Sequence, residues 1–383
     1  MNKSLLSLAI GTFALGIAEF GMMGILNDVA TDLDISVVKA GHLISAYSAG
    51  VAVGSPFLII LRKLPLRRLM LLLAAVIALG NAMVALSPGY NVLLIARFIS
   101  GLPHGAFFGA GAIVCSRLAG EGKGASAVAV LIGGMTVANL IGVPGSTYLC
   151  NLVSWRLPFA VVSTCGILAF IAMRTFVPVL APLPDTGIRG QFRFLSHLAP
   201  WLIYGGVFFG QASVYCWLSY ISPIMTDVTG FTNASMSYIM IIVGAGMVFG
   251  NLFAGRLADR HSPALVTGIF AAIVVVLMPL IYLFATDKIP SLVFAFIAPA
   301  LLFGIGGPLQ YIIVRFAKGG EMLGGAGIQI AFNVSNAMAA ILGGMAIHHG
   351  LGLASPALVG IPCAVIGATS LFILYHKYHT QGA

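Results

Sequence analysis

Long apolar runs dominate this sequence and constrain its fold more than any other feature. Each run has about the 20 residues that a helix needs to cross a bilayer. Lipid offers no hydrogen-bond partners to the peptide backbone, so a run of this kind has to be helical where it spans. We therefore predict an all-α membrane protein with twelve transmembrane helices, at residues 5–26, 41–61, 69–87, 91–116, 125–150, 157–177, 197–220, 236–256, 264–284, 291–314, 323–347 and 355–376.

The composition supports a chain embedded in lipid. Hydrophobic residues make up 60% of the sequence and charged residues 8%, against about 45–50% and about 25% in soluble domains. The first run follows Lys3, as in a signal peptide, but it is long enough to span, so we expect a retained helix. The net charge of +9 is spread over short gaps between the runs and does not indicate nucleic-acid binding.

The same basic residues predict the orientation of the chain. With the N-terminus in the cytoplasm, fifteen Lys and Arg residues fall in inner segments, and three fall in outer ones, namely Lys39, Arg156 and Lys288. Inner loops of membrane proteins carry the excess of Lys and Arg. We predict a multi-pass protein of a bacterial inner membrane, with both termini cytoplasmic.

The sequence also divides into two similar halves. The longest polar gap, "VPVLAPLPDTGIRGQFRFLSH", is rich in proline and basic residues. The stretch "GVAVGSPFLIILRKLPLRR" from Gly50 aligns with "GMVFGNLFAGRLADRHSPA" from Gly246, and both contain a G-x-x-x-G pair that allows close helix approach. We predict pseudo-symmetric six-helix bundles at residues 1–177 and 197–383 with a cytoplasmic linker at 178–196, the organisation of a transporter that rocks around a central site.

Three segments resemble signature motifs of the major facilitator superfamily. "RFISGLPHGAFFGA", which contains Gly101 and Gly105, is similar to the fourth-helix motif R-x-x-x-G-x-x-x-G. "GNLFAGRLADR", from Gly250, resembles the loop motif of the superfamily, and "GGMTVANLIGVPG" resembles the fifth-helix antiporter motif. The resemblance covers nearly the whole chain and implies the twelve-helix fold of the drug:proton antiporter and sugar-efflux-like branch.

The sequence departs from these motifs at two places. After the second run, Arg62 and Lys63 stand where the family carries an acid, and in the antiporter motif Val143 separates Gly142 from Pro144. The resemblance then implies that the charge relay of the loop is rearranged or is carried by the second copy. It also implies that the second copy forms a latch at the cytoplasmic end, although its charges would equally serve to set topology; they are Arg256, Asp259 and Arg260.

Glu19 is the only acid within a predicted span. At about 1.5 Å per residue it lies about 10 Å inside the outer boundary, and Arg97 on the fourth run lies about 9 Å below the same boundary. An unpaired charge at the bilayer centre costs at least about 2.5–3.5 kcal/mol, so we predict that the two side chains pair. Glu19 would bind a proton on one side and release it on the other, with Arg97 as the competitor. A permanent structural pair is the alternative.

Polar side chains elsewhere predict the rest of the site. His104 lies two helical turns after Arg97 on the same face, where it could relay protons, contact substrate or simply donate one hydrogen bond. In the second half, amides form a stripe that either joins helices or faces a wet cavity. The predicted cavity residues are Phe108, Asn139, Gln211, Tyr215, Gln310, Gln329, Asn333 and Asn336.

These features together predict a secondary transporter that moves a small organic solute by alternating access, with proton-coupled efflux as the leading interpretation. A sugar or nucleoside carrier working by symport or facilitated diffusion is the alternative. A membrane enzyme would need H-E-x-x-H or paired intramembrane acids, and ATP-driven transport would need G-x-x-x-x-G-K-[ST]; the sequence has neither. We expect a monomer that uses no cofactor and binds no metal.

Overall fold

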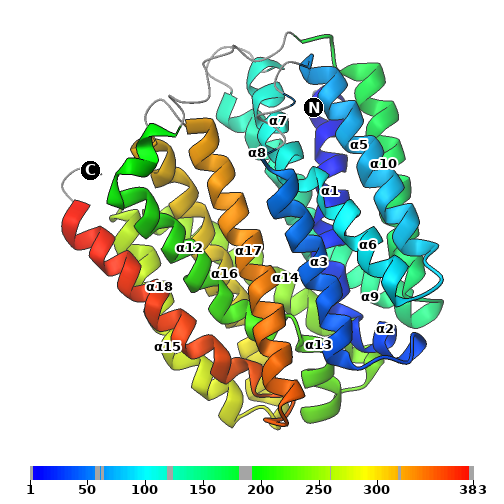
Figure 1. Cartoon of the computed structure of the whole chain (residues 1–383), viewed down its shortest axis with the longest axis vertical. Helices are drawn as coiled ribbons and strands as arrows, with labels where there is room; N and C mark the ends of the chain where they lie inside the picture. Colours follow the sequence, from blue (N-terminus) through cyan, green and yellow to red (C-terminus); the bar gives the residue numbers. More distant parts are fainter. Residues whose placement is uncertain are drawn as a thin grey trace.

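A computed structural model describes residues 3–56, 61, 64–118, 124–180, 192–258, 260–317 and 321–378, and this part of the chain folds into helices joined by short connections (Figure 1). The helices of the first half are α1 (Lys3–Gly24), α2 (Leu26–Asp32), α3 (Val37–Gly54), α5 (Leu66–Ala85), α6 (Tyr90–Gly101), α7 (Pro103–Leu118), α8 (Gly124–Val137), η2 (Ala138–Gly142), α9 (Val143–Leu152) and α10 (Arg156–Phe176). Those of the second half are η3 (Arg193–Ser196), α12 (Leu198–Leu218), α13 (Ile221–Pro223), η4 (Ile224–Val228), η5 (Asn233–Ser235), α14 (Met236–Ala258), α15 (Pro263–Leu283), α16 (Lys288–Phe316), α17 (Glu321–His348) and α18 (Pro356–Tyr378).

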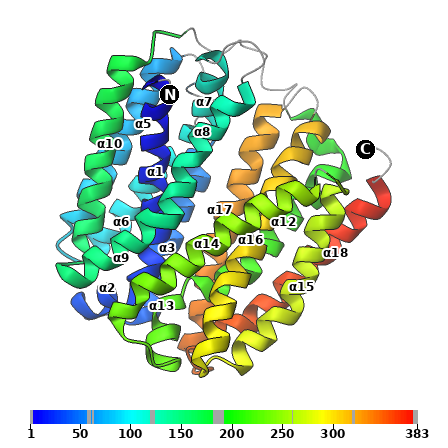
Figure 2. The same ribbon diagram turned by 180° about the vertical axis from the view of Figure 1, so that it is seen from behind.

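Ten helical segments of the described chain are long and apolar enough to cross a membrane. Two further helices, α3 and α12, run beside them through the same layer (Figures 1 and 2). Together these positions correspond to the twelve predicted spans, with three differences of detail. The short α2 follows the first span, Lys39 lies in the first turn of α3 rather than in a loop, and the fourth and fifth spans are each interrupted.

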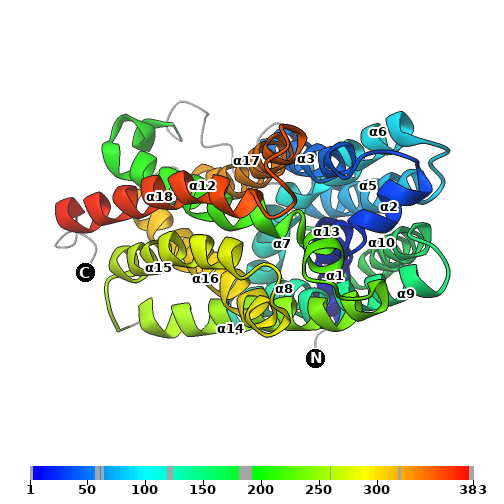
Figure 3. The ribbon, with the colours of Figure 1, turned by 90° about the horizontal axis from the view of Figure 1, so that it is seen from below.

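The two halves pack their helices in equivalent pairs. In the first half α1 contacts α10, α3 contacts α6, and α5 contacts α10; in the second half α12 contacts α18, α14 contacts α16, and α15 contacts α18. Between the halves, α3 lies against α17, and α14 lies against α9 and η2, as the end-on view in Figure 3 shows. This repetition supports the predicted internal symmetry. The middle of the predicted linker, residues 181–191, lies outside the described residues, so the boundary between the halves stays a prediction.

Glycines of the aligned segments explain why these pairs approach so closely. A side chain at Gly54 of α3 would collide with the backbone carbonyl of Leu102, and a side chain at Gly250 of α14 would collide with that of Ala300. The two contacts occupy corresponding positions in the two halves. The G-x-x-x-G pairs therefore set the same helix–helix contact twice, through direct backbone packing.

Prolines account for the interrupted spans. Pro103 has no amide hydrogen, and the hydrogen-bond ladder of the fourth span is interrupted between Gly101, where α6 ends, and the start of α7. Pro144, in the first turn of α9, leaves the carbonyl four residues earlier without its usual donor, and the preceding turn is the π-helix η2. The antiporter-like motif thus forms an irregular helix that packs directly against α14 in the other half.

The halves meet at the end of the molecule opposite the N-terminus, which we call the outer end in line with the predicted orientation. The Asn27 amide donates to Thr226 at 3.2 Å and to Asp227 at 3.3 Å, and the Asn151 amide donates to the Asn233 carbonyl at 3.1 Å. Toward the inner end, the helices of the two halves spread apart (Figures 1 and 2). The structure therefore resembles a carrier that is closed at its outer end.

A polar cluster also fastens the outer end of the first half. The Asp32 carboxylate accepts hydrogen bonds from the Trp155 indole at 2.8 Å and from Arg156 at 2.7 Å. These donors, Trp155 first, hold the pKa of Asp32 below its ordinary range. The turn that precedes α10 is therefore tied to α2.

We expect Gly250→Ala to lower the thermal stability of the detergent-solubilised protein, by about 1–3 kcal/mol, because the added methyl group overpacks the contact with α16. The matched control is Gly255→Ala on the same helix, where a methyl group meets nothing within 4 Å. The control should be neutral or gain up to about 1 kcal/mol from helix propensity. Equal melting temperatures for the two variants would contradict the packing role of Gly250.

Candidate functional site

The carboxylate of Glu19 lies deep in the first half, on α1. Its side chain is 1% exposed, and neither of its oxygens has a hydrogen-bond partner in the described structure. The basic group beside it is His104, whose Nε2 lies 3.7 Å from Glu19 Oε2, just beyond hydrogen-bonding distance. Buried carboxylates are almost always hydrogen-bonded, so this acid has unused capacity to bind a proton or a ligand.

Arg97 does not form the predicted ion pair with Glu19 in this structure. Its Nη1 donates to the Ala18 carbonyl at 2.7 Å, and its Nε donates to the Leu43 carbonyl at 3.2 Å. The guanidinium lies 4.5 Å from the centroid of the Tyr47 ring, a cation–π distance. These partners engage Nη1 and Nε without the carboxylate, because a guanidinium can divide its five donors among several acceptors, and Nη2 has no hydrogen-bond partner in the described structure. The two charges are thus neighbours through the α1 backbone rather than direct partners.

Tyr47 on α3 connects the basic groups. Its hydroxyl lies 2.9 Å from His104 Nδ1, and its ring lies beneath Arg97. Sequence reasoning missed this residue, because a tyrosine in an apolar run is most often packing. The available signal was its setting among small residues in "ISAYSAG", where neighbouring helices come close. Indeed, a side chain at Gly101 would collide with the Tyr47 carbonyl.

The helix break in the fourth span positions His104. It lies in the first turn of α7, directly after Pro103, and its side chain is 2% exposed. Its ring stacks on Phe108 at 5.3 Å between centroids. The structure therefore brings together four side chains from four helices: Glu19, His104, Tyr47 and Arg97.

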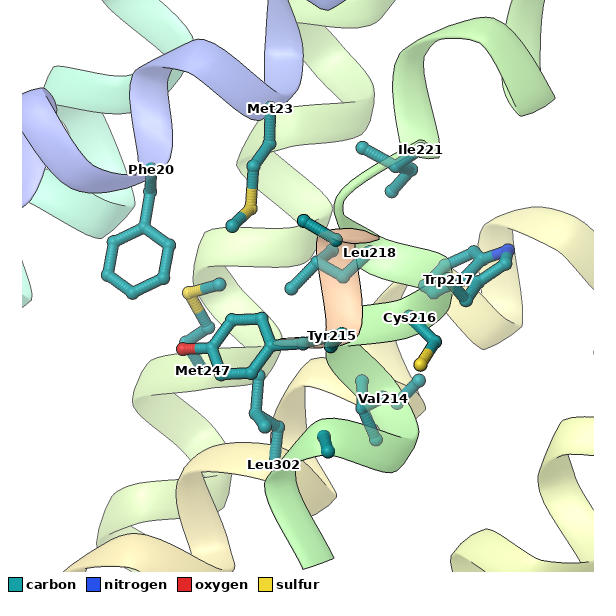
Figure 4. Packing of buried hydrophobic residues seen from close by; sticks show 14 of the residues in the cluster. Phe20, Met23, Val214, Tyr215, Cys216, Trp217, Leu218, Ile221, Met247 and Leu302 are labelled. Carbon is teal, nitrogen blue, oxygen red and sulfur yellow. The ribbon is translucent and has the colours of Figure 1, made fainter. Parts of the chain in front are cut away.

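Aromatic rings extend from this cluster into the second half. Phe20 on α1 lies 5.7 Å from Phe303 on α16, Phe303 lies 6.4 Å from Phe332 on α17, and Phe332 meets Tyr215 on α12 edge-on at 5.5 Å. Figure 4 shows the Tyr215 ring directed toward Phe20 and Met247. The Tyr215 hydroxyl is fully buried, has no hydrogen-bond partner in the described structure, and interacts electrostatically with Glu19.

Two of the predicted amides in the second half join neighbouring helices, and several have a side-chain oxygen that accepts no hydrogen bond in the described structure. Gln211 Nε2 donates to the Leu302 carbonyl at 3.4 Å, and Gln310 Nε2 donates to the Gly325 carbonyl at 3.5 Å, so each joins two helices. Asn333 Nδ2 donates to the Gln329 carbonyl at 3.0 Å within α17. Among the residues that the structure describes, the side-chain oxygens of these three donors have no hydrogen-bond partner, and the same holds for both polar atoms of Asn336 and the amide oxygen of Asn139.

The remaining predicted residues lie away from this cluster. Arg256 is exposed, and Arg260 lines a cavity of about 580 Å³ at the inner end of the second half, between α14, α15, α16 and α18. Asp259 lies outside the described residues, so the latch stays a prediction. In the first half, Gly105 faces Ser55, Gly142 packs against Ile17, and Pro144 is buried.

Comparison with known proteins shows relatives over the whole length of this chain. The chain is 43% identical to the putative transporter AraJ of Escherichia coli K12, over 100% of this chain and 97% of AraJ. It is 31% identical to the inner membrane transport protein YdhP of the same strain over 100% and 97%, and 29% identical to a chloramphenicol resistance protein of Streptomyces lividans over 93% and 92%.

A solved structure has the same fold. A bacterial homologue of the human lysosomal transporter Spinster, in an inward-facing and occupied conformation, matches 99% of this chain and 97% of its own with a TM-score of 0.77 at 13% identity. Residues 8–327 match the sequence profile of the Major Facilitator Superfamily. The chain therefore belongs to the major facilitator superfamily, a family of secondary transporters and not of enzymes.

Proposed function

We propose that this transporter exports a small organic solute from the bacterial cytoplasm in exchange for protons. The observation that carries the proposal is Glu19, a carboxyl 1% exposed and without a hydrogen-bond partner in the described structure, next to His104. A carboxylate that lacks donors in a low-dielectric interior favours its protonated form, and access to water favours the ionised form. Alternating exposure to the two sides therefore converts a proton gradient into cycles of binding and release.

The neighbours of Glu19 suit such a switch. Arg97 interacts with it electrostatically but is held by the Ala18 and Leu43 carbonyls. The cation can therefore favour proton release without locking the carboxylate into a permanent ion pair. This arrangement favours coupling over the purely structural pair, for which a direct contact would be expected.

The outer contacts between the halves support exchange with the cytoplasmic side in this state. The hydrogen bonds of Asn27 and Asn151 across the halves lie at the outer end. They would have to break for the site to open outward. A further bond across the halves runs from the Ser45 hydroxyl to the Ala337 carbonyl at 2.9 Å. Bonds of about 1 kcal/mol each, or about 1.5–3 kcal/mol for the one to the Asp227 carboxylate, are weak enough for a transporter that passes through both states.

The solute would lie between the aromatic rings and the spare amide oxygens. Phe303, Phe332 and Tyr215 offer apolar surface, and Gln211 and Asn336 offer hydrogen-bonding groups. This combination suits a neutral or weakly cationic solute that carries hydroxyl or amino donors. A sugar carrier is the second candidate, which the spare amide acceptors favour, and one relative, 26% identical, is named a probable sugar efflux transporter of Helicobacter pylori.

Glu19→Gln in reconstituted vesicles should abolish solute flux driven by an imposed pH gradient, since the amide cannot carry a proton. Solute counterflow without a gradient should continue, because the fold and the solute contacts remain. The matched control is Asp28→Asn on α2, outside the spans, which should leave gradient-driven flux in place. Unchanged pumping by Glu19→Gln would remove Glu19 from this role.

Asn336→Leu should weaken solute binding about five- to tenfold, the loss expected for one hydrogen bond of about 1–1.5 kcal/mol. The measurement is a thermal-shift titration with sugars, nucleosides, chloramphenicol and lipophilic cations, starting from whichever solute stabilises the unmodified protein. Asn81→Leu, on α5 of the other half, is the control for loss of a buried amide. Equal affinity of Asn336→Leu and the unmodified protein would exclude Asn336 from the solute site.

A further inference from the structure

Tyr47 contacts two members of the Glu19 cluster through two different parts of its side chain. The hydroxyl lies 2.9 Å from His104 Nδ1 and 3.5 Å from the Leu15 carbonyl, and the ring face lies 4.5 Å from the Arg97 guanidinium carbon. The side chain is 1% exposed, so water does not compete for these contacts. Because its hydroxyl and its ring face each have a partner, Tyr47 can fix the orientation of both His104 and Arg97.

The hydroxyl contacts indicate which nitrogen of His104 carries the hydrogen. A tyrosine has one O–H to donate. The Leu15 carbonyl is the weaker acceptor for it, because that contact is 3.5 Å long, at the limit of a hydrogen bond. Donation to His104 Nδ1 at 2.9 Å is therefore favoured. A neutral imidazole with an accepting Nδ1 carries its hydrogen on Nε2, the atom that faces Glu19.

We propose that Tyr47 is a positioning residue that holds His104 as the Nε2–H tautomer and so directs an N–H donor at Glu19. The inference deepens the proposed function and rests on it for its effect on transport. At 3.7 Å the His104 Nε2–H and the Glu19 carboxylate are not yet bonded. A movement of less than about 1 Å would form a hydrogen bond that stabilises the ionised acid and promotes proton release.

The Tyr47 ring has a separate effect on the same acid. By holding Arg97 on its face, it keeps the guanidinium on the Ala18 and Leu43 carbonyls. In the described structure, the charged or titratable side chains that interact with Glu19 are Arg97 from α6, His104 from α7, Tyr47 from α3 and Tyr215 from α12. Tyr47→Phe keeps the ring and removes only the hydroxyl, which isolates its effect on His104.

The tautomer can be measured without any transport assay. Nitrogen-15 NMR of histidine-labelled protein distinguishes protonated from unprotonated ring nitrogens, and His104→Asn identifies the His104 signals by their loss. We expect a protonated Nε2 and an unprotonated Nδ1 in the unmodified protein above neutral pH, and a mixture of both tautomers in Tyr47→Phe. An Nδ1–H tautomer in the unmodified protein would overturn the inference.

The effect on coupling is a shift in pH dependence. In Tyr47→Phe the midpoint of the pH dependence of solute exchange should move to higher pH by up to about 1 unit, because the Nε2–H donor is present for only part of the time and the carboxyl holds its proton more tightly. Tyr204→Phe is the matched control, since it removes a hydroxyl that donates to the Gly324 carbonyl at 3.1 Å, away from Glu19. A midpoint in Tyr47→Phe equal to that of the control would overturn the role of Tyr47.

The two proposals fail in distinguishable ways. If Glu19→Gln keeps gradient-driven flux, the proposed coupling fails, whereas the His104 tautomer still tests the geometry around Tyr47. If Glu19→Gln loses that flux, while Tyr47→Phe keeps the His104 tautomer of the unmodified protein and the pH midpoint of Tyr204→Phe, the coupling stands and only the role of Tyr47 fails.

Discussion

The burial of one carboxylate without a hydrogen-bond partner among the described residues is the constraint on which the rest of this structure depends. A charge in the bilayer interior is stable only beside a partner or water, and Glu19 has neither an ion pair with Arg97 nor a hydrogen bond to His104 in this state. The first half therefore surrounds it with groups that can respond to its charge. These groups, Tyr47, Arg97 and His104, come from α3, α6 and α7, so three helices besides α1 contribute to the surroundings of the acid.

Close backbone packing between helices fixes the positions of the side chains around Glu19. Gly101 brings α6 against the Tyr47 carbonyl, and Gly54 brings α3 against the Leu102 carbonyl. The same type of contact recurs at Gly250 in the second half, which has no acid at the corresponding depth. The two halves thus share a scaffold but differ in chemistry: one provides titratable groups, and the other provides amides and aromatic rings.

Much of the fold followed from the sequence, because hydrophobic length is a local property that a bilayer translates directly into helices. The spans, the repeat of Gly50 and Gly246, and the family were all predicted, and the helices and the comparisons confirm the all-helical transporter fold. Depth along each helix correctly placed Glu19 and Arg97 at one level. Rotation about the helix axis and side-chain partners depend on tertiary packing, which depth alone does not determine.

For that reason the predicted Glu19–Arg97 ion pair was wrong, and Tyr47 was missed. Every residue has a backbone carbonyl that can accept a hydrogen bond, whatever its side chain. The sequence therefore could not indicate that Arg97 donates to the carbonyls of Ala18 and Leu43. His104 was predicted on the Arg97 face, but its position 3.7 Å from Glu19 depends on how α7 packs against α1, which has no local signal. The solute and gating roles of the other predicted residues remain predictions.

The π-helix η2 lies at a contact between the two halves. It packs directly against α14 across the interface between the halves. A π turn holds one extra residue relative to an α-helix, so the backbone of the fifth span is locally wider where it meets the other half. A side chain at Gly244 of α14 would collide with the Asn139 carbonyl of η2, so at this seam the two halves touch backbone to backbone.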